Sequence, residues 1–328
     1  MAIRKNNAQI AVIKETAEGI YTAPGAANCI LVQDVEFSVD GESFDRSELR
    51  GDFNKMDPIV GPASASLKFT WLGKGSGSAG VAPEIGAALM GCGFSQVTTS
   101  GTSVAYNAVA RFDGSTAANT IYPGPSYSVV LLEDGWVYPI KGAWGNLDVE
   151  CGVGEPLKLT FEYKGAFVQP SASGLFAAPS FNATIPPTFL SAGVTIPKAS
   201  GSFNAPIFTS LKYGAGNTVE LRKNANDAMG IMGAMIVDRR PTVSVDPEAV
   251  DQATWDMFAA WRQGAAGSVS TAVLGSALGN RLQVLAPRCV LKKPAFGDRN
   301  GLRTYNLDFA VASLPTDADG TALTIKFS

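Results

Sequence analysis

The stretch Leu157-Lys158-Leu159-Thr160-Phe161-Glu162-Tyr163 alternates apolar and polar side chains at every position. This period of two predicts a β-strand with one face against a core and the other face outward. Upstream, residues 126–132 and 136–140 flank Glu133-Asp134-Gly135, which is a hairpin signal. Residues 147–151 are predicted to form a further strand. The middle of the chain is therefore expected to consist of antiparallel strands.

Toward the N-terminus, residues 35–39 and 67–71 show the same alternation. The charge-dense residues 40–62 between them are predicted to form a long loop with apolar side chains of its own. Pro83-Glu84 indicates the start of a short helix, since proline and an acid both favour the first helical turn. Residues 1–30 contain apolar positions broken by Pro24 and Gly25, and an extended arm is expected there.

Toward the C-terminus, strands are predicted around residues 211–213, 243–245, 282–284, 289–291 and 303–311. A charged loop over residues 216–240 separates the first two, and Pro247-Glu248 predicts a helix over residues 249–261. The expected fold class is mainly β, a β-sandwich or barrel with one flanking helix per unit.

The two halves of the chain share an order: strand, charged loop, strand, Pro-Glu helix start, further strands. An offset of 176 residues pairs apolar and matching positions: Val35 with Leu211, Phe37 with Tyr213, Arg46 with Arg222, Met56 with Met232, Leu67 with Val243 and Phe69 with Val245. Two tandem domains explain this pattern, and two unrelated α+β domains of similar layout remain the alternative. The predicted division is an arm (1–30), a first domain (31–167), a Pro-rich extended connector (168–205) and a second domain (206–328).

Composition limits the function. Charged residues make up 17% of the chain and apolar residues 46%, against about 25% charged in an average protein. A surface poor in charge is typical of one that meets other proteins. The chain has no histidine, which removes His-based catalysis and the commonest metal ligand. The formal net charge of −3 argues against a protein that binds nucleic acid.

Other chemical motifs are weak. Gly75-Ser76-Gly77-Ser78-Ala79-Gly80 matches a dinucleotide-binding pattern, but no acid lies about 20 residues further on, and a flexible loop is expected. Asp317-Ala318-Asp319-Gly320 resembles part of a calcium loop but is expected to be a hairpin turn. The four cysteines, Cys29, Cys92, Cys151 and Cys289, are far apart and are predicted to be reduced and buried. We expect no cofactor, no bound metal and no catalytic residue.

Residues 27–94 resemble the N-terminal part of phage major tail tube proteins. The similarity lies in Ala27-Asn28-Cys29-Ile30-Leu31-Val32, Asp45-Arg46-Ser47-Glu48-Leu49-Arg50, Leu67-Lys68-Phe69-Thr70-Trp71, Pro83-Glu84-Ile85-Gly86 and Gly91-Cys92-Gly93-Phe94. The strand at 157–163, followed by Lys164-Gly165, also looks like this family. The resemblance implies a structural virion protein of a long-tailed, siphovirus-like phage, and not an enzyme.

The resemblance further implies stacked rings that form a hollow tube through which DNA is ejected without specific binding. Tandem domains would close such a ring as a trimer with pseudo-sixfold symmetry. The implied partners are further copies of the chain and the tail tip, tape measure and tail terminator proteins. The implied location is the virion tail after synthesis in the host cytoplasm, since no signal peptide or membrane span is evident. A sheathless tail is the preferred form.

The two charged loops are expected to order when rings stack. The residues predicted to make these assembly contacts are Phe44, Leu49, Phe53, Met56, Ile59, Met232 and Met235. Residues 1–30 are a second candidate for contact between rings.

Three alternatives remain at the level of sequence. The first is another phage structural protein, such as a capsid decoration protein or a tail terminator, or a secreted β-sandwich fibre. The second is a monomeric β-rich module that binds a ligand through Trp136, Trp144 or Tyr138. The third is a carboxylate-based glycosidase, which low charge and the lack of an evident acid pair disfavour. Oligomeric state separates the first class from the other two.

Overall fold

The computed structural model describes residues 4, 6–49, 51–52, 54–109, 124–313 and 322–328. The fold is mainly β, as predicted, with several antiparallel sheets and two short α-helices in the described part. The largest sheet has thirteen strands: β1 (Ala8–Lys14), β2 (Cys29–Ile30), β3 (Gln33–Arg46), β4 (Met56–Leu72), β7 (Tyr127–Glu133), β8 (Trp136–Gly152), β9 (Lys158–Phe167), β10 (Ser171–Ala172), β13 (Ser210–Gly214), β16 (Thr242–Val245), β17 (Ala266–Gly267), β19 (Cys289–Lys293) and β22 (Leu307–Val311).

The order of these strands joins the two halves of the chain. Neighbours run β3, β4, β9, β8, β13, β16, β22, β19 and β17, and all pair antiparallel. The link is β8 with β13, where Val149 lies opposite Tyr213 and Cys151 opposite Leu211. The first part of β8 also pairs with β7, which continues to β1 and β2. The seventeen-residue β8 is thus the strand on which both halves meet.

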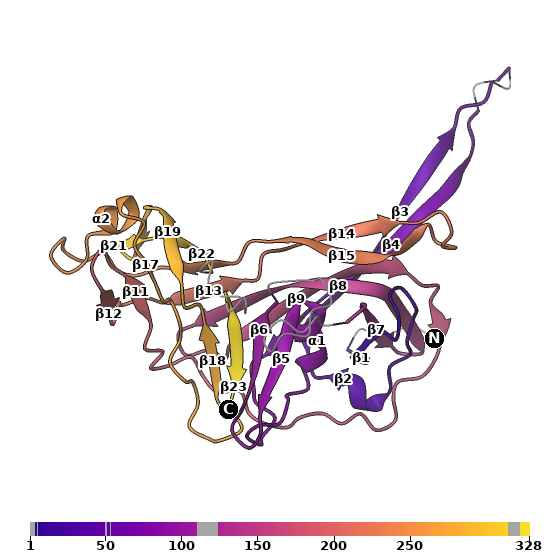
Figure 1. Ribbon diagram of the computed structural model, residues 1–328. Helices are drawn as coiled ribbons and strands as arrows, with labels where there is room; N and C mark the ends of the chain where they lie inside the picture. Colours follow the sequence, from indigo (N-terminus) through magenta and orange to yellow (C-terminus); the bar gives the residue numbers. More distant parts are fainter. Residues whose placement is uncertain (1–3, 5, 50, 53, 110–123, 314–321) are drawn as a thin grey trace.

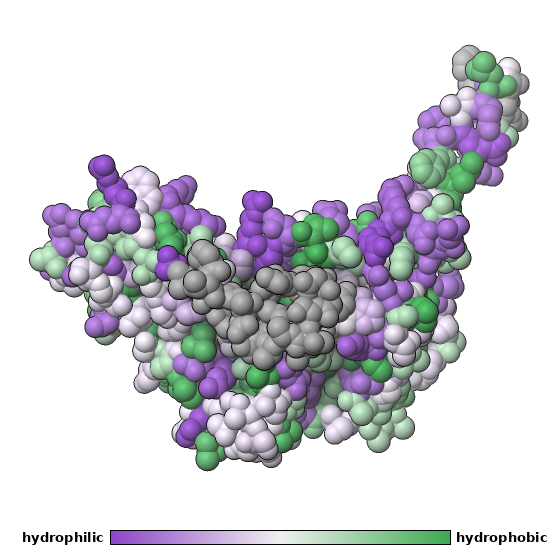
Figure 2. Space-filling view, viewed as in Figure 1, coloured by the Kyte–Doolittle hydropathy of each residue, from purple (hydrophilic) through white to green (hydrophobic). Residues whose placement is uncertain are grey.

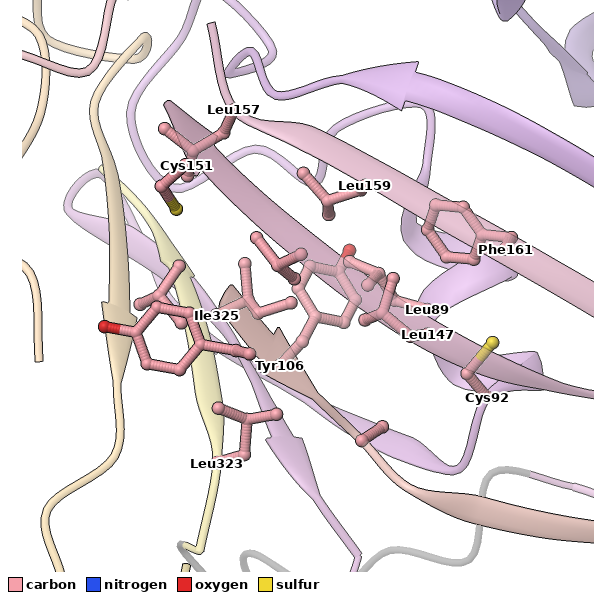
Figure 3. Packing of buried hydrophobic residues seen from close by; sticks show 14 of the residues in the cluster. Leu89, Cys92, Tyr106, Leu147, Cys151, Leu157, Leu159, Phe161, Leu323 and Ile325 are labelled. Atoms are coloured by element: carbon pink, nitrogen blue, oxygen red, sulfur yellow. The ribbon is translucent and has the colours of Figure 1, made fainter. Parts of the chain in front are cut away.

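A second layer covers the apolar face of this sheet. It contains α1 (Gly86–Gly91) and a four-stranded sheet of β5 (Phe94–Thr99), β6 (Ser103–Ala108), β23 (Thr324–Phe327) and β18 (Leu282–Leu285). The alternation in β9 is confirmed, because Leu159, Phe161 and Tyr163 are fully buried while Glu162 is exposed. Figure 3 shows Leu323 and Ile325 from the end of the chain beside Tyr106 from the first half. One hydrophobic core therefore spans both halves.

The remaining elements are small or lie apart from the core. They are a 3-10 turn η1 (Ala26–Asn28), β11 (Thr195–Pro197), β12 (Ser202–Asn204), β14 (Asn217–Lys223), β15 (Ile231–Arg239), α2 (Met257–Arg262), β20 (Phe296–Arg299) and β21 (Leu302–Tyr305). The distal half of the β3–β4 hairpin projects from the body as an arm, which we define as residues 39–62 (Figure 1). The β14–β15 hairpin runs along the body toward the base of this arm.

Strand registers coincide between the halves under the 176-residue offset. It carries the pair Phe37 and Leu67 of β3–β4 onto Tyr213 and Val243 of β13–β16. Further out, it carries Phe44 and Ile59 onto Glu220 and Met235 of β14–β15. Both hairpins also have a register shift at the same relative point, after Gly41 and after Thr218. The β3–β4 hairpin and the combined β13–β14 and β15–β16 segments thus have one layout.

Three local predictions differ from the structure. Residues 40–62 and 216–240 form long β-hairpins and not loops, because their alternating residues pair across the hairpin. Residues 1–30 do not form a free arm: β1 pairs with β7 over its whole length and buries Ile10 and Val12. These residues form an apolar run that fits an inner strand better than an exposed segment.

The second predicted helix is shorter than expected. Helix α2 covers only Met257–Arg262 and begins at Asp256, whose carboxylate accepts a hydrogen bond from the Ala259 amide at 2.8 Å. Glu248 instead forms a β-bridge with Thr304, so Pro247-Glu248 extends a strand ladder and does not open a helix. An aspartate N-cap satisfies the free amides of a first turn, and that signal determined the helix start.

The connector at residues 168–205 is extended, with only the short strands β10, β11 and β12. Phe189, Val194 and Ile196 of this segment are buried in the core of their own chain, whereas Ile185 and Leu190 are exposed.

Candidate assembly surfaces

The face of the large sheet that points away from the core is polar across both halves of the chain. Lys212 of β13 pairs with Glu150 of β8 at 2.7 Å between Nζ and Oε1. Further along the sheet, the Ser244 hydroxyl donates to Asp308 at 2.7 Å. Alternation forces this arrangement, because every second residue of a half-buried strand points away from the core.

An acidic groove lies on this polar face where β3, β4, β9 and β8 run side by side. Its volume is about 440 Å³, and its lining is Asp34, Glu36, Lys68, Thr70, Asn146, Asp148, Glu150, Thr160 and Glu162. Five of these residues are acids and one is a lysine. Desolvation in the groove, with the carboxylates of Glu150 and Glu162, raises the pKa of Asp148. The groove therefore disfavours additional negative charge.

The arm exposes apolar side chains on a strand pair that leaves the body of the protein. Phe44 is 53% exposed, and its cross-strand neighbour Ile59 is 56% exposed. Val60 is 82% exposed and Leu49 is fully exposed. Figure 2 shows hydrophobic residues among hydrophilic ones along this projection. Exposed apolar side chains on a projecting hairpin are typical of surfaces that contact another protein.

The β14–β15 hairpin, unlike the arm, rests on its own chain. Ala234 and Ile236 pack on Trp144 of β8 in a small separate cluster. Lys141 of β8 forms an ion pair with Asp227 at 2.6 Å, and both side chains are largely buried. Burial of these groups fixes the hairpin against the first half of the chain.

Backbone contact holds the same hairpin close to β8. Gly142 has a φ of +59°, and a Cβ added to Gly233 would lie 2.8 Å from the Gly142 carbonyl oxygen. The Gly142 amide donates at 2.8 Å to Glu15, a carboxylate that is 3% exposed. The buried Arg239 guanidinium, at the end of β15, donates to the carbonyl oxygens of Cys92 and Gly93. None of these contacts follows from local sequence, because each joins residues more than 80 positions apart.

The structure places the predicted contact residues in two groups. Phe44, Leu49 and Ile59 are exposed on the arm. Met56 is half-buried and lies opposite Arg46 in the outermost pair of the β3–β4 ladder, toward the tip of the arm. Met235 is 41% exposed, whereas Met232 is half-buried. Phe53 lies outside the described residues. The two groups belong to the equivalent hairpins, of which only the arm projects.

The glycine-rich loop and Trp144, which were considered as possible ligand-binding features, contact other parts of their own chain. Lys74, beside the glycine-rich loop, is 4% exposed and forms an ion pair with Glu84 at 3.1 Å. Its ammonium group also donates to the Asn182 carbonyl oxygen at 2.7 Å, so the loop is tied to the connector. Trp144, a predicted ligand-binding residue, is buried under β15, while Trp136 stays 42% exposed. The segment Asp317–Gly320 lies outside the described residues.

The thiols and the helices add two observations. Cys29, Cys92, Cys151 and Cys289 are all buried and free, as predicted. Burial raises the pKa of Cys92, Cys151 and Cys289 to about 12. Across the described ranges, no helix is long and apolar enough to cross a membrane.

A family model described as phage tail tube protein matches residues 5–311, which is most of the chain. The chain belongs to the phage tail tube protein family. Among curated proteins, no significant match to the chain was found. The family is a structural one and not an enzyme family, and a tail tube protein assembles with itself and with other tail proteins in the virion.

Proposed function

We propose that three copies of this tail tube chain close into a ring with pseudo-sixfold symmetry, and that rings stack into the hollow tube that conducts DNA at ejection. The main support is the coincidence of strand registers between the β3–β4 hairpin and the β13–β16 segments, which is the pattern that two equivalent tube domains in one sheet would give. Three such chains supply six equivalent positions around one axis. A long-tailed, siphovirus-like phage is the proposed source.

The polar face of the sheet is proposed to line the channel. The groove with Asp148, Glu150 and Glu162 gives this face an excess of negative charge. A protein that held DNA would need lysines and arginines to neutralise phosphates, and their binding would slow passage. An acidic wall repels phosphates at a distance of about one Debye length, roughly 8 Å at physiological salt. The DNA therefore slides without specific binding.

The lining proposal can be tested by reversing charge in the groove. We expect Asp148→Lys with Glu162→Lys to leave tubes intact while purified tubes begin to retain labelled double-stranded DNA at low salt. The matched control is Asp238→Lys with Asp251→Lys, because these exposed acids lie outside the groove. Equal DNA retention by both double variants would contradict the assignment of the channel face.

The arm is proposed to contact the next ring through Phe44, Leu49, Phe53, Met56 and Ile59, with Met232 and Met235 of the second hairpin beside that contact. Phe44 and Ile59 are about half exposed, so their burial between rings would stabilise the contact by about 1 kcal/mol per side chain. Deletion of the tip between Ser47 and Lys55 should leave the fold unchanged and abolish tubes. A finer variant is Phe44→Ser with Ile59→Ser, and its control is Ile185→Ser, an 82% exposed apolar residue on the connector.

The deciding measurement is negative-stain electron microscopy of the purified chain over a concentration series. Rings or tubes with threefold or pseudo-sixfold end views are expected from the wild type and the Ile185→Ser control. Tubes of normal length from the tip deletion would refute the role of the arm. Hexameric end views made of six whole chains would refute the trimer.

A further inference from the structure

β3 and β20 are among the strands that have one edge without a partner strand in the described part of the chain. β3 lies at an edge of the large sheet and pairs with β4 alone, and β20 belongs to a separate two-stranded sheet, in which it pairs with β21 alone. By contrast, the last part of β8 is paired on both sides, with β9 and with β13. Unpaired edges present free amide and carbonyl groups that favour the addition of a strand.

The registers of the second half show which part of the first half β20 matches. The pair Leu67 and Tyr163 of β4–β9 corresponds to Val243 and Phe309 of β16–β22. If this correspondence is followed along β9 and β22, Leu159 matches Tyr305 of β21. Leu159 lies opposite Val149 of β8, and Tyr305 lies opposite Phe296 of β20. The register shift between Leu291 and Lys293 in β19 absorbs the one-residue difference along the way.

The isolated bridge between Glu248 and Thr304 fits the same scheme. It matches the pair Leu72 and Lys158, which ends the ladder between β4 and β9. β20 therefore corresponds to the end of β8, and β3 corresponds to β13 by the 176-residue offset. Within the chain, β8 pairs with β13. The strands that correspond to them, β20 and β3, do not pair with each other in the same molecule.

We propose that β20 of one copy pairs antiparallel with β3 of a second copy, in the register that β8 adopts with β13. Val149 lies opposite Tyr213 within the chain, so Phe296 of one copy lies opposite Phe37 of the other. Gly297 then faces Glu36, and Ala295 faces Ser38. This inference rests on the proposed function, because it assigns the contact that closes the ring.

The side chains at the two edges suit this contact. Phe296 is 51% exposed and lies 6.2 Å from the ring of Phe258, which is itself 50% exposed. Phe37 is half-buried, and its ring lies 5.2 Å from that of Tyr138. The matching residues inside the chain, Val149 and Tyr213, are each 1% exposed. Pairing of the edges would bring two aromatic groups together and remove them from water.

A groove and a difference in charge support the same partner. A groove of about 1080 Å³ follows β3, and its lining includes Asp34, Glu36 and Glu133. Arg303 of the β20–β21 hairpin is exposed, whereas Arg299 is held within the chain by ion pairs with Asp246 and Glu248. An exposed arginine that meets an acidic strand edge gains from charge complementarity. The groove and this charge favour a second copy of this chain as the occupant of the β3 edge.

Cysteine crosslinking tests the register directly. Within the chain, the Ala215 amide donates to the Leu147 carbonyl oxygen at 2.8 Å, so the next pair, Asp148 with Gly214, is a non-hydrogen-bonded pair. Ala295 and Ser38 correspond to that pair. Non-hydrogen-bonded pairs have Cα atoms about 4.5 Å apart, which a disulfide can span. The native cysteines are buried and do not compete.

The test variant is Ser38→Cys with Ala295→Cys, assembled into tubes, mildly oxidised and analysed by non-reducing electrophoresis and peptide mass spectrometry. We expect most of the monomer band to convert into covalent trimer, with a 38–295 disulfide between copies. Ser38→Cys with Lys293→Cys places the second thiol, at an exposed position, two residues out of register, and its band is expected to stay at the monomer position. Each single variant is expected to lack the trimer band.

Amide hydrogen exchange of the wild-type chain tests the same edge pairing without any substitution. Residues 36–38 and 295–297 should gain protection together when free chains assemble. Tubes that show no such protection, or that crosslink better through the out-of-register pair, would overturn the edge pairing while the tube function stands. Wild-type chains that form neither rings nor tubes under any tested condition would overturn the proposed function, and the edge pairing with it.

Discussion

Glu15 is buried at the meeting point of β1, β7 and β8, and its removal should strongly destabilise the fold. Its carboxylate accepts hydrogen bonds from the Gly19 amide at 2.9 Å, the Gly142 amide at 2.8 Å and the Ser128 hydroxyl at 2.8 Å, and also from the Ser126 hydroxyl. In Glu15→Ala the hydroxyls can rotate to other partners, and the Gly19 amide keeps its second acceptor, the Ser126 hydroxyl at 3.2 Å, but the Gly142 amide loses its carboxylate acceptor. An orphaned buried amide costs about 1–3 kcal/mol, and this is the expected loss.

Glu15→Gln should be less costly. Its carbonyl oxygen can still accept from the Gly142 amide, while its amide nitrogen can donate to the Ser126 hydroxyl. The Gly19 amide also reaches that hydroxyl, so no amide is orphaned and the expected loss is about 1 kcal/mol or less. Glu18→Ala is the matched control, because Glu18 makes an ion pair with Arg222 near the surface. Such pairs contribute about 0–1 kcal/mol.

The assay is urea unfolding of dilute, unassembled chain, followed by tryptophan fluorescence and near-UV circular dichroism. Linear extrapolation gives the free energy of unfolding in water, and an unchanged slope shows that the same surface is exposed. A loss below about 1 kcal/mol for Glu15→Ala would refute the reasoning from orphaned amides. A Glu15→Gln variant as unstable as Glu15→Ala would do the same.

Three further predictions concern the hairpin, the groove and the thiols. Gly233→Ala should cost about 1–3 kcal/mol in urea unfolding, because its Cβ would meet the Gly142 carbonyl oxygen, whereas Gly41→Ala, with open space around it, should cost little. Asp148→Asn should raise stability at neutral pH. Because the pKa of Asp148 is raised above its ordinary 3.8, protonation favours the folded state; this gain is present below pH 3.8 and is lost as pH rises through the raised pKa. The variant should therefore match the wild type at low pH in a pH series of thermal melts, and a constant difference would contradict the cause. Cys92, Cys151 and Cys289 should not react with a thiol reagent at pH 8 until urea unfolds the chain, since their pKa values are about 12; fast labelling of the folded chain would show that the core opens.

The fold class and most strands were predictable because one physical signal, alternation against a single core, dominates them. Residues 157–163 carry that signal without interruption, and β9 follows it. Residues 40–62 also form strands, but both faces of their projecting hairpin are exposed, so charged residues occupy both faces. The apolar–polar alternation that marks a half-buried strand is therefore absent from this segment. Residues 249–261 misled for the opposite reason: an apolar helical spacing is present, but pairing of Glu248 with Thr304 keeps its first part extended.

The assembly surfaces were predictable only in part. The exposure of Phe44 and Ile59 was predictable, because each is an apolar residue within a charge-dense segment. The acidic groove does not, because Glu36, Asp148 and Glu162 come from three strands whose neighbourhood depends on sheet order. The sequence did not show that Met232 would be more buried than Met235. A shift of the strand register by one residue would exchange which side chains face the body of the protein. Long-range pairing, and not local preference, determines these features.

The pairing of β23 with β6 affects how the protein is made. Phe327 lies opposite Val104 in the second layer, so the N-terminal half lacks a strand of that layer until residues 324–327 have left the ribosome. Contacts of such large sequence separation form late in folding. We therefore expect a chain that ends before residue 324 to leave the second layer of the first half incomplete and this part of the core open to water.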